Sequence, residues 1–133
     1  MEAKRGIRAV SDKSMPEEEL FAAFWQGLSH PIRLRILGEL GREGALNVGE
    51  LVGRIGIGQG HLSNHLACLK SCGFVAAESR GRFVYYTIRD PRVTALLSAG
   101  HSLMHDHRDG ISACSLVSSP NAQALAFVVR PPD

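Results

Sequence analysis

Cysteine thiols are the side chains of this sequence best suited to hold a ligand. Cys68 and Cys72 are four residues apart in a stretch, 57–74, that we interpret as one helix. At that spacing both side chains leave the same helical face, with Cβ atoms roughly 5–6 Å apart, so two thiolates can grip one soft metal ion. A buried cysteine pair beside a leucine stripe has the same spacing, so the pair alone leaves both interpretations open.

The same stretch carries three kinds of side chain on different faces. A stripe suited to packing recurs at helical spacing and consists of Leu62, Leu66 and Leu69. A polar face suited to a partner carries Gln59, Ser63 and Lys70. Between them His61, His65, Cys68 and Cys72 line one edge. For His65 we favour a structural role at the packing edge over metal ligation.

Further elements must position this helix. An aromatic-rich helix follows Ser14 and Pro16, and a second helix begins at Pro31 and breaks at 41–44. A short third helix begins after Asn47, where Glu50 completes a capping-box pattern, and ends at Gly56. After the 57–74 helix come two strands, 74–79 and 83–88, and a last helix that starts at Asp90-Pro91 and extends to about residue 107.

Two short helices joined by a glycine-containing turn form the pattern of a helix-turn-helix, and a hairpin follows them with Arg80 and Arg82 on either side of Gly81. The sequence therefore predicts a mainly α fold with a small β-hairpin wing, a winged helix-turn-helix. We expect base contacts from Gln59, His61, Ser63 and Asn64 and phosphate contacts from Lys70, Arg80 and Arg82.

Bulk composition fits one domain with tails. The chain has 133 residues, of which 44% are hydrophobic and 21% charged, with a net charge of +2. We divide it into a flexible basic arm, 1–13, a DNA-binding and dimerisation domain, 14–107, and a tail, 108–133, that carries Cys114. No apolar run reaches the ~18 residues that span a membrane, and the start lacks the pattern of a secretory signal. We expect a cytoplasmic protein with no membrane partner and no disulfide framework.

Several short motifs together resemble the ArsR/SmtB family of metal-sensing repressors, over about residues 17–106. They are His30-Pro31-Ile32-Arg33-Leu34-Arg35-Ile36-Leu37, Leu62-Ser63-Asn64-His65-Leu66, Gly73-Phe74-Val75 and Gly81-Arg82-Phe83-Val84-Tyr85-Tyr86. The resemblance implies a homodimer built on the first and last helices. It also implies a repressor, not an enzyme, that binds operator DNA when metal-free and leaves it when metal binds.

The resemblance also separates the possible metal sites. The Cys-x-Cys pair that many members carry falls here on Asn47 and Gly49, and the Asp-x-His of another site falls on Asp90 and Arg92. The candidate ligands that remain are Cys68, Cys72 and Cys114. This set is similar to the ligand set of the cadmium- and lead-sensing branch, and the mercury-responsive members are a close alternative. Soft thiolates favour Cd(II), Pb(II) or Hg(II), and Zn(II) less, because zinc usually takes a fourth ligand. Whether Cys114 acts within or between subunits stays open.

Other interpretations remain. The three cysteines can instead form a redox or persulfide switch in a repressor of the same fold. An enzyme with a nucleophilic Cys68 or Cys72 assisted by His65 is disfavoured, because no oxyanion hole or substrate pocket is evident. A second, borderline-metal site at His101, His105 and His107 is a weaker hypothesis than a solvated helix end.

Overall fold

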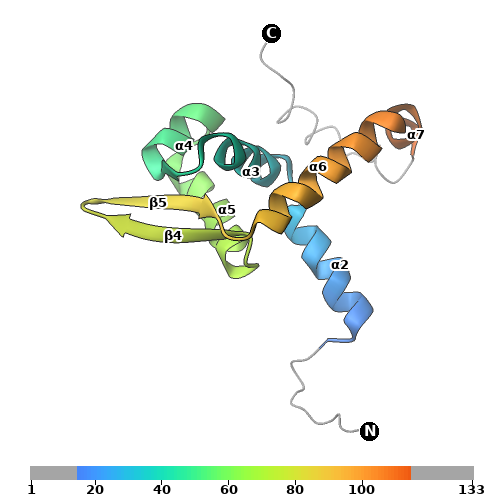
Figure 1. Cartoon of the computed structure of the whole chain (residues 1–133), viewed down its shortest axis with the longest axis horizontal. Coiled ribbons are helices and arrows are strands. Elements are labelled where there is room, and N and C mark those ends of the chain that lie inside the picture. The colour runs from blue at the N-terminus through green and yellow to red at the C-terminus, as the bar shows by residue number, and fades with distance from the viewer. Residues whose placement is uncertain (1–14, 115–133) are drawn as a thin grey trace, which may run out of the picture.

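The computed structural model describes residues 15–114, so the predicted basic arm, Ser14 and residues 115–133 lie outside the described part. The elements in chain order are α2 (Glu17–Leu28), α3 (Pro31–Glu43), β3 (Leu46–Asn47), α4 (Val48–Ile55), α5 (Gln59–Ser71), β4 (Val75–Arg80), β5 (Phe83–Ile88), α6 (Pro91–Asp106) and α7 (Arg108–Ala113). This order confirms the predicted mainly α fold with a hairpin wing (Figure 1).

Side-chain caps fix the starts of α3, α4 and α6. His30 caps α3, because its Nδ1 accepts a hydrogen bond from the backbone N–H of Ile32 at 3.0 Å. The capping box predicted for α4 is present: Asn47 Oδ1 accepts from Glu50 N at 2.8 Å, and Glu50 Oε1 accepts from Asn47 N at 2.9 Å. At α6, the Asp90 side chain accepts from the backbone N–H of Arg92.

Two predicted helices differ from the structure at their ends. The helix that begins at Pro31 continues through Gly41 and ends at Gly44, whose φ of +89° suits a residue without a Cβ. The predicted 57–74 helix is shorter at both ends: Gly58 precedes its first residue, and Cys72 is the cap that follows Ser71. Gly73 then turns the chain at a φ of +84° into the first strand of the wing.

A three-stranded antiparallel sheet has the strand order β3-β5-β4. In the wing hairpin Arg80 pairs with Phe83, so Gly81 and Arg82 form a two-residue turn, and Gly81 has the positive φ (+63°) that such turns favour. Strand β3 was not predicted, because two residues are too few to show a period. Leu46 lies opposite Tyr86, which joins the wing to the chain just before α4.

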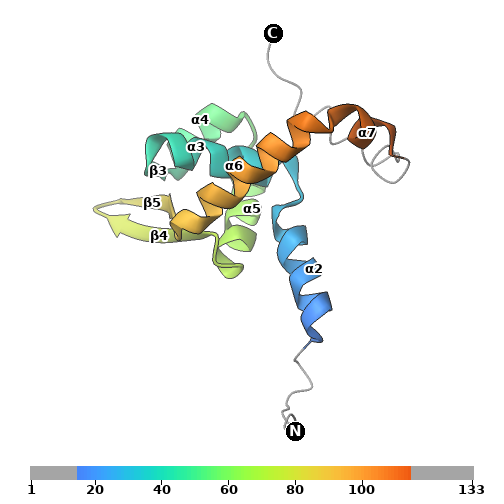
Figure 2. The same ribbon diagram turned by 45° about the vertical axis from the view of Figure 1, so that its right-hand side comes forward.

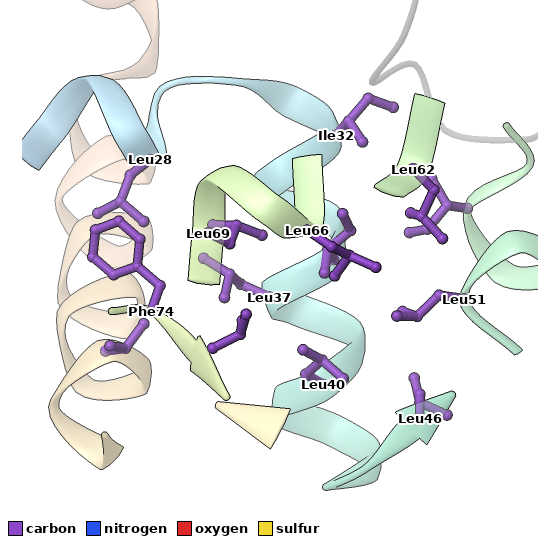
Figure 3. Close-up of a cluster of buried hydrophobic side chains, with 14 residues drawn as sticks. Leu28, Ile32, Leu37, Leu40, Leu46, Leu51, Leu62, Leu66, Leu69 and Phe74 are labelled. Carbon is purple, nitrogen blue, oxygen red and sulfur yellow. The ribbon is translucent and has the colours of Figure 1, made fainter. Parts of the chain in front are cut away.

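The core lies where α5 crosses α3 beneath the sheet. Figure 3 shows Leu62, Leu66 and Leu69 of α5 pointing into a cluster with Leu37 and Leu40 of α3. All five of these side chains are almost fully buried, as the predicted leucine stripe requires. Burial of this stripe fixes the rotation of α5 about its axis and hence the direction of its other faces.

Helices α2 and α6 extend beyond this core in different directions in both views (Figures 1 and 2). Each carries large apolar side chains that the single chain leaves exposed, including Leu20, Phe21 and Trp25 on α2 and Leu103 and Met104 on α6. No helix within residues 15–114 combines the length and the apolar character needed to cross a membrane.

Candidate functional site

The predicted DNA-contacting side chains of α5 are all exposed. Helix α4, the turn at Gly56 and helix α5 form the helix-turn-helix, and Gly56 takes a left-handed conformation with a φ of +83°. The exposed residues along α5 include Gln59, His61, Ser63, Asn64 and Lys70. Since the leucine stripe faces the core, this polar surface is free to enter a groove of DNA.

The two wing arginines are also exposed, but they differ in their surroundings. The Arg80 guanidinium donates to Glu78 Oε1 at 3.1 Å and lies 4.8 Å from the centre of the Tyr85 ring. These contacts orient Arg80 along the strand. Arg82 lies in the turn itself, at the tip of the hairpin that projects from the molecule in both views (Figures 1 and 2).

The structure brings Cys68 and Cys72 together. The two thiols are close enough to interact electrostatically, although Cys72 lies just beyond the last helical residue of α5. Cys68 is half-buried, and the Cys72 sulfur lies against α2: a Cβ placed on Gly27 would be only 3.1 Å from it. Partial burial and the neighbouring Cys68 thiol raise the pKa of Cys72. A metal ion must therefore displace a proton there, so its affinity rises with pH.

Cys114 does not join the pair within one chain. It follows the last residue of α7 and is exposed. Within residues 15–114, no three His, Cys, Asp or Glu side chains gather in a group that suits a metal ion. Cys68 and Cys72 thus provide two of the three thiolates of the predicted site. The third ligand of such a site must come from elsewhere.

Three histidine rings lie close together, tilted to one another, where α5 meets the start of α3. The ring centres of His30 and His65 are 4.3 Å apart, and those of His61 and His65 are 5.0 Å apart. His65 is only 8% exposed, and its Nε2 has no hydrogen-bond partner among residues 15–114. Burial and then the neighbouring His30 and Arg33 lower the pKa of His65 to about 4, so it is neutral at pH 7. This placement agrees with the structural role predicted for His65.

Arg33 is a member of this site that the sequence did not single out. Its guanidinium donates to the Gln26 backbone oxygen at 3.1 Å, and its Nε is buried without a partner. The charge of Arg33 acts on His30, His65 and Cys72 together, and at Cys72 it opposes the rise in pKa. The sequence signal for this role was the position of Arg33 in the first turn of the helix that begins at Pro31. From that position a charged side chain reaches back toward the preceding helix.

The histidines at the end of α6 do not form a second metal site in this part of the chain. His101 and His105 stack with their ring centres 6.3 Å apart, as expected of residues on one helical face. His107 caps the end of α6, and all three are exposed.

Comparisons with known proteins agree with this geometry. The model of the family described as bacterial regulatory proteins of the ArsR type matches residues 30–77, which span α3, the helix-turn-helix and the start of the wing. A probable mercury resistance operon repressor of Streptomyces lividans is 31% identical over 121 residues, which are 91% of this chain and 96% of that protein. The chain belongs to the ArsR family.

Two mycobacterial members of the ArsR family extend the comparison. The regulator CmtR of Mycobacterium tuberculosis is 36% identical over 80 residues, 60% of this chain and 67% of the relative. The crystal structure of M. tuberculosis Rv0081 superposes with a TM-score of 0.69 at 33% identity, and the match covers 75% of this chain and all of that one. The family resemblance, the winged-helix fold and the expectation of a DNA-binding regulator and not an enzyme are confirmed.

The buried His65 predicts a pH-dependent stability. Because its pKa in the folded state lies below the ordinary 6.5, its contribution is fully present above pH 6.5 and is lost as the pH falls toward 4. Between pH 7 and pH 5 the wild type should lose about 2 kcal/mol of unfolding free energy relative to His65→Gln, measured by urea denaturation. The exposed His107→Gln serves as the control, and an equal pH profile for wild type and His65→Gln would contradict the assignment.

Proposed function

We propose that this ArsR-family repressor binds operator DNA as a homodimer and releases it when Cd(II), Pb(II) or Hg(II) binds Cys68, Cys72 and Cys114. The observation that carries the proposal is the contact between the Cys68 and Cys72 thiols at the end of α5, the helix whose exposed face bears Gln59 and Ser63. Ligand and DNA thus act on one helix.

The exposed apolar surfaces of α2 and α6 support the homodimer. A groove of about 320 Å³ lies between these helices, and its walls include Trp25, Leu34, Leu97 and Met104. Leaving such surface in water is unfavourable, and a second copy of the chain covers it with the same residues around a two-fold axis. Dimerisation also places two α5 helices and two wings on one operator.

We assign the third thiolate to Cys114 of the partner subunit. Within one chain Cys114 lies apart from the other two sulfurs, at the far end of α6 and α7 from the wing (Figure 1). A dimer through α2 and α6 brings the partner's α6 beside α2, and α2 touches Cys72 at Gly27. Ligation across the interface would then make metal binding sensitive to how the two subunits are arranged.

Thiolate chemistry and the relatives favour soft ions. The S. lividans relative is named for mercury resistance, and a pair of sulfurs without a nearby carboxylate or histidine ligand suits Hg(II), Cd(II) or Pb(II). Ligation draws the Cys72 sulfur away from α2 or moves α2 with it, and either change alters the orientation of α5 relative to the partner's α5. A coupling of about 1.4 kcal/mol would lower DNA affinity tenfold.

A metal titration of the reduced protein tests the proposal. Each of the three ions should give ultraviolet sulfur-to-metal charge-transfer bands that saturate at one ion per subunit, and should release fluorescent operator DNA over the same range. Replacement of Cys68, Cys72 or Cys114 by Ser should weaken both effects at least tenfold, and Mg(II) is the matched control ion. DNA that stays bound at saturating metal but leaves on oxidation would make the cysteines a redox switch.

A mixed dimer tests the origin of the third thiolate. One subunit carries Cys114→Ser and the other carries Cys68→Ser with Cys72→Ser, so neither homodimer has three thiolates in any site. If the ligand crosses the interface, the heterodimer regains one complete site and binds about one ion per dimer with wild-type charge-transfer bands. A heterodimer that binds no better than its parents would place Cys114 in its own subunit's site.

The wing predicts a salt-dependent contribution to DNA affinity. Arg82→Ala removes an exposed cation at the hairpin tip, so binding should weaken on all sequences and the slope of log K against log salt should fall by about 1 for each phosphate that Arg82 neutralises. Fluorescence anisotropy at several salt concentrations measures both. Arg108→Ala, at the opposite end of the molecule (Figures 1 and 2), is the control, and an unchanged slope for Arg82→Ala would argue against wing contact.

A further inference from the structure

A second cavity opens directly at Cys72 and is larger than one metal ion requires. It has a volume of about 420 Å³ and lies between the end of α5, α2 and the start of α6. Phe24, Phe74, Val93 and Leu96 supply apolar side chains to its wall, and the exposed Cys72 lies at its edge. We call this cavity the Cys72 groove.

The charged residues of the Cys72 groove neutralise each other. Arg92 Nη2 lies 2.8 Å from Asp90 Oδ2, and Arg92 Nε donates to the same carboxylate. Asp90 is further occupied as the cap of α6. The groove therefore presents the Cys72 thiol and apolar surface, with its charges paired, and the Cys68 thiol lies beside Cys72.

This combination suits a soft metal ion that carries an organic group. A monoorganomercury cation, R–Hg⁺, needs one thiolate to complete its linear coordination, whereas its organic substituent gains free energy by leaving water. A bare ion has no organic group to bury against the apolar wall. Cys68 supplies a neighbouring sulfur, and Phe24 and Leu96 supply the surface for the substituent.

We propose that the Cys72 groove binds monoorganomercury cations, with mercury on Cys72 and the organic group against Phe24 and Leu96. The inference rests on the proposed function, because it extends the ligands of the same thiol pair to organometallic ones. The step is a ligand exchange: an S–Hg bond forms at Cys72, the bond from mercury to the thiolate or acetate that it carried breaks, and this leaving ligand and the thiol proton pass to solvent. Nothing is oxidised or reduced.

A ligand series in the wild-type protein measures the contribution of the groove. Phenylmercury and methylmercury are bound to the protein and titrated with glutathione, which competes for mercury through a thiol without an apolar pocket. Trp25 reports occupancy by heavy-atom quenching, because it is the only tryptophan in the sequence and its ring lies 5.2 Å from that of Phe24. Phenylmercury should resist about tenfold more glutathione than methylmercury, as expected from the extra apolar area buried.

Two neighbouring leucines provide matched variants. Leu96 and Leu97 are both partly buried on α6, and both line the groove between α2 and α6. Of the two, Leu96 also lines the Cys72 groove, so Leu97→Ala controls for effects that act through the shared groove. Leu96→Ala should reduce the phenylmercury advantage several-fold, and Leu97→Ala should preserve it. Equal resistance of the two organomercurials in the wild type, or an equal loss in both variants, would overturn the inference.

The organomercury site and the metal-released repressor are rejected by different results. Operator release by Hg(II), Cd(II) or Pb(II) with no phenylmercury advantage would reject the groove alone. A phenylmercury advantage that Leu96→Ala removes, with operator bound at saturating metal ion, would support the groove and reject the metal-released repressor.

Discussion

Burial of one leucine stripe fixes the orientation of α5, and the rest of the structure depends on that constraint. Leu62, Leu66 and Leu69 are buried against α3, so the helix cannot rotate without exposing them at a cost of about 1.5–3 kcal/mol each. Once its rotation is fixed, the polar face must point outward and the cysteine edge must point toward α2. A helix of 13 residues thereby combines a core element, the proposed DNA-contacting surface and Cys68, with Cys72 as its C-cap.

The contact of Cys72 with α2 joins the thiols to the proposed dimer interface. A Cβ on Gly27 would lie 3.0 Å from Phe74 Cε2 and 3.1 Å from Cys72 Sγ, so a side chain there would require both neighbours to shift by a few tenths of an ångström. Phe24, one turn earlier, stacks edge-on against Phe74 with ring centres 5.2 Å apart. A change in the position of Cys72 is therefore transmitted to the helix that also bears the exposed Phe21 and Trp25, which gives allosteric coupling a short physical route.

Much of this architecture follows from local sequence patterns. The leucine period, the Asn47 capping box and Asp90-Pro91 each depend on neighbouring residues, and each appears in the structure as predicted. The hairpin also appears, but Arg80 belongs to its first strand, so the turn is one residue shorter than the predicted tip. Contacts between distant residues were not predictable in the same way. Strand β3 exists because β5 pairs with it. The contact between the His30 and His65 rings depends on the approach of α3 to α5. The proposed third thiolate, Cys114 of the partner subunit, would depend on a subunit arrangement that no local pattern encodes.

We propose that metal-ion binding and operator binding oppose each other through α5. Thermodynamic linkage between the two ligands is the most direct test. The affinity for Cd(II) is measured for the free protein and for the protein saturated with operator, alongside the operator affinity with and without Cd(II). The account predicts that both affinities fall, and by the same factor, because the coupling free energy is reciprocal. A Cd(II) affinity that is unchanged on operator DNA would show that the thiol pair and the DNA-contacting face are independent, and would contradict the account.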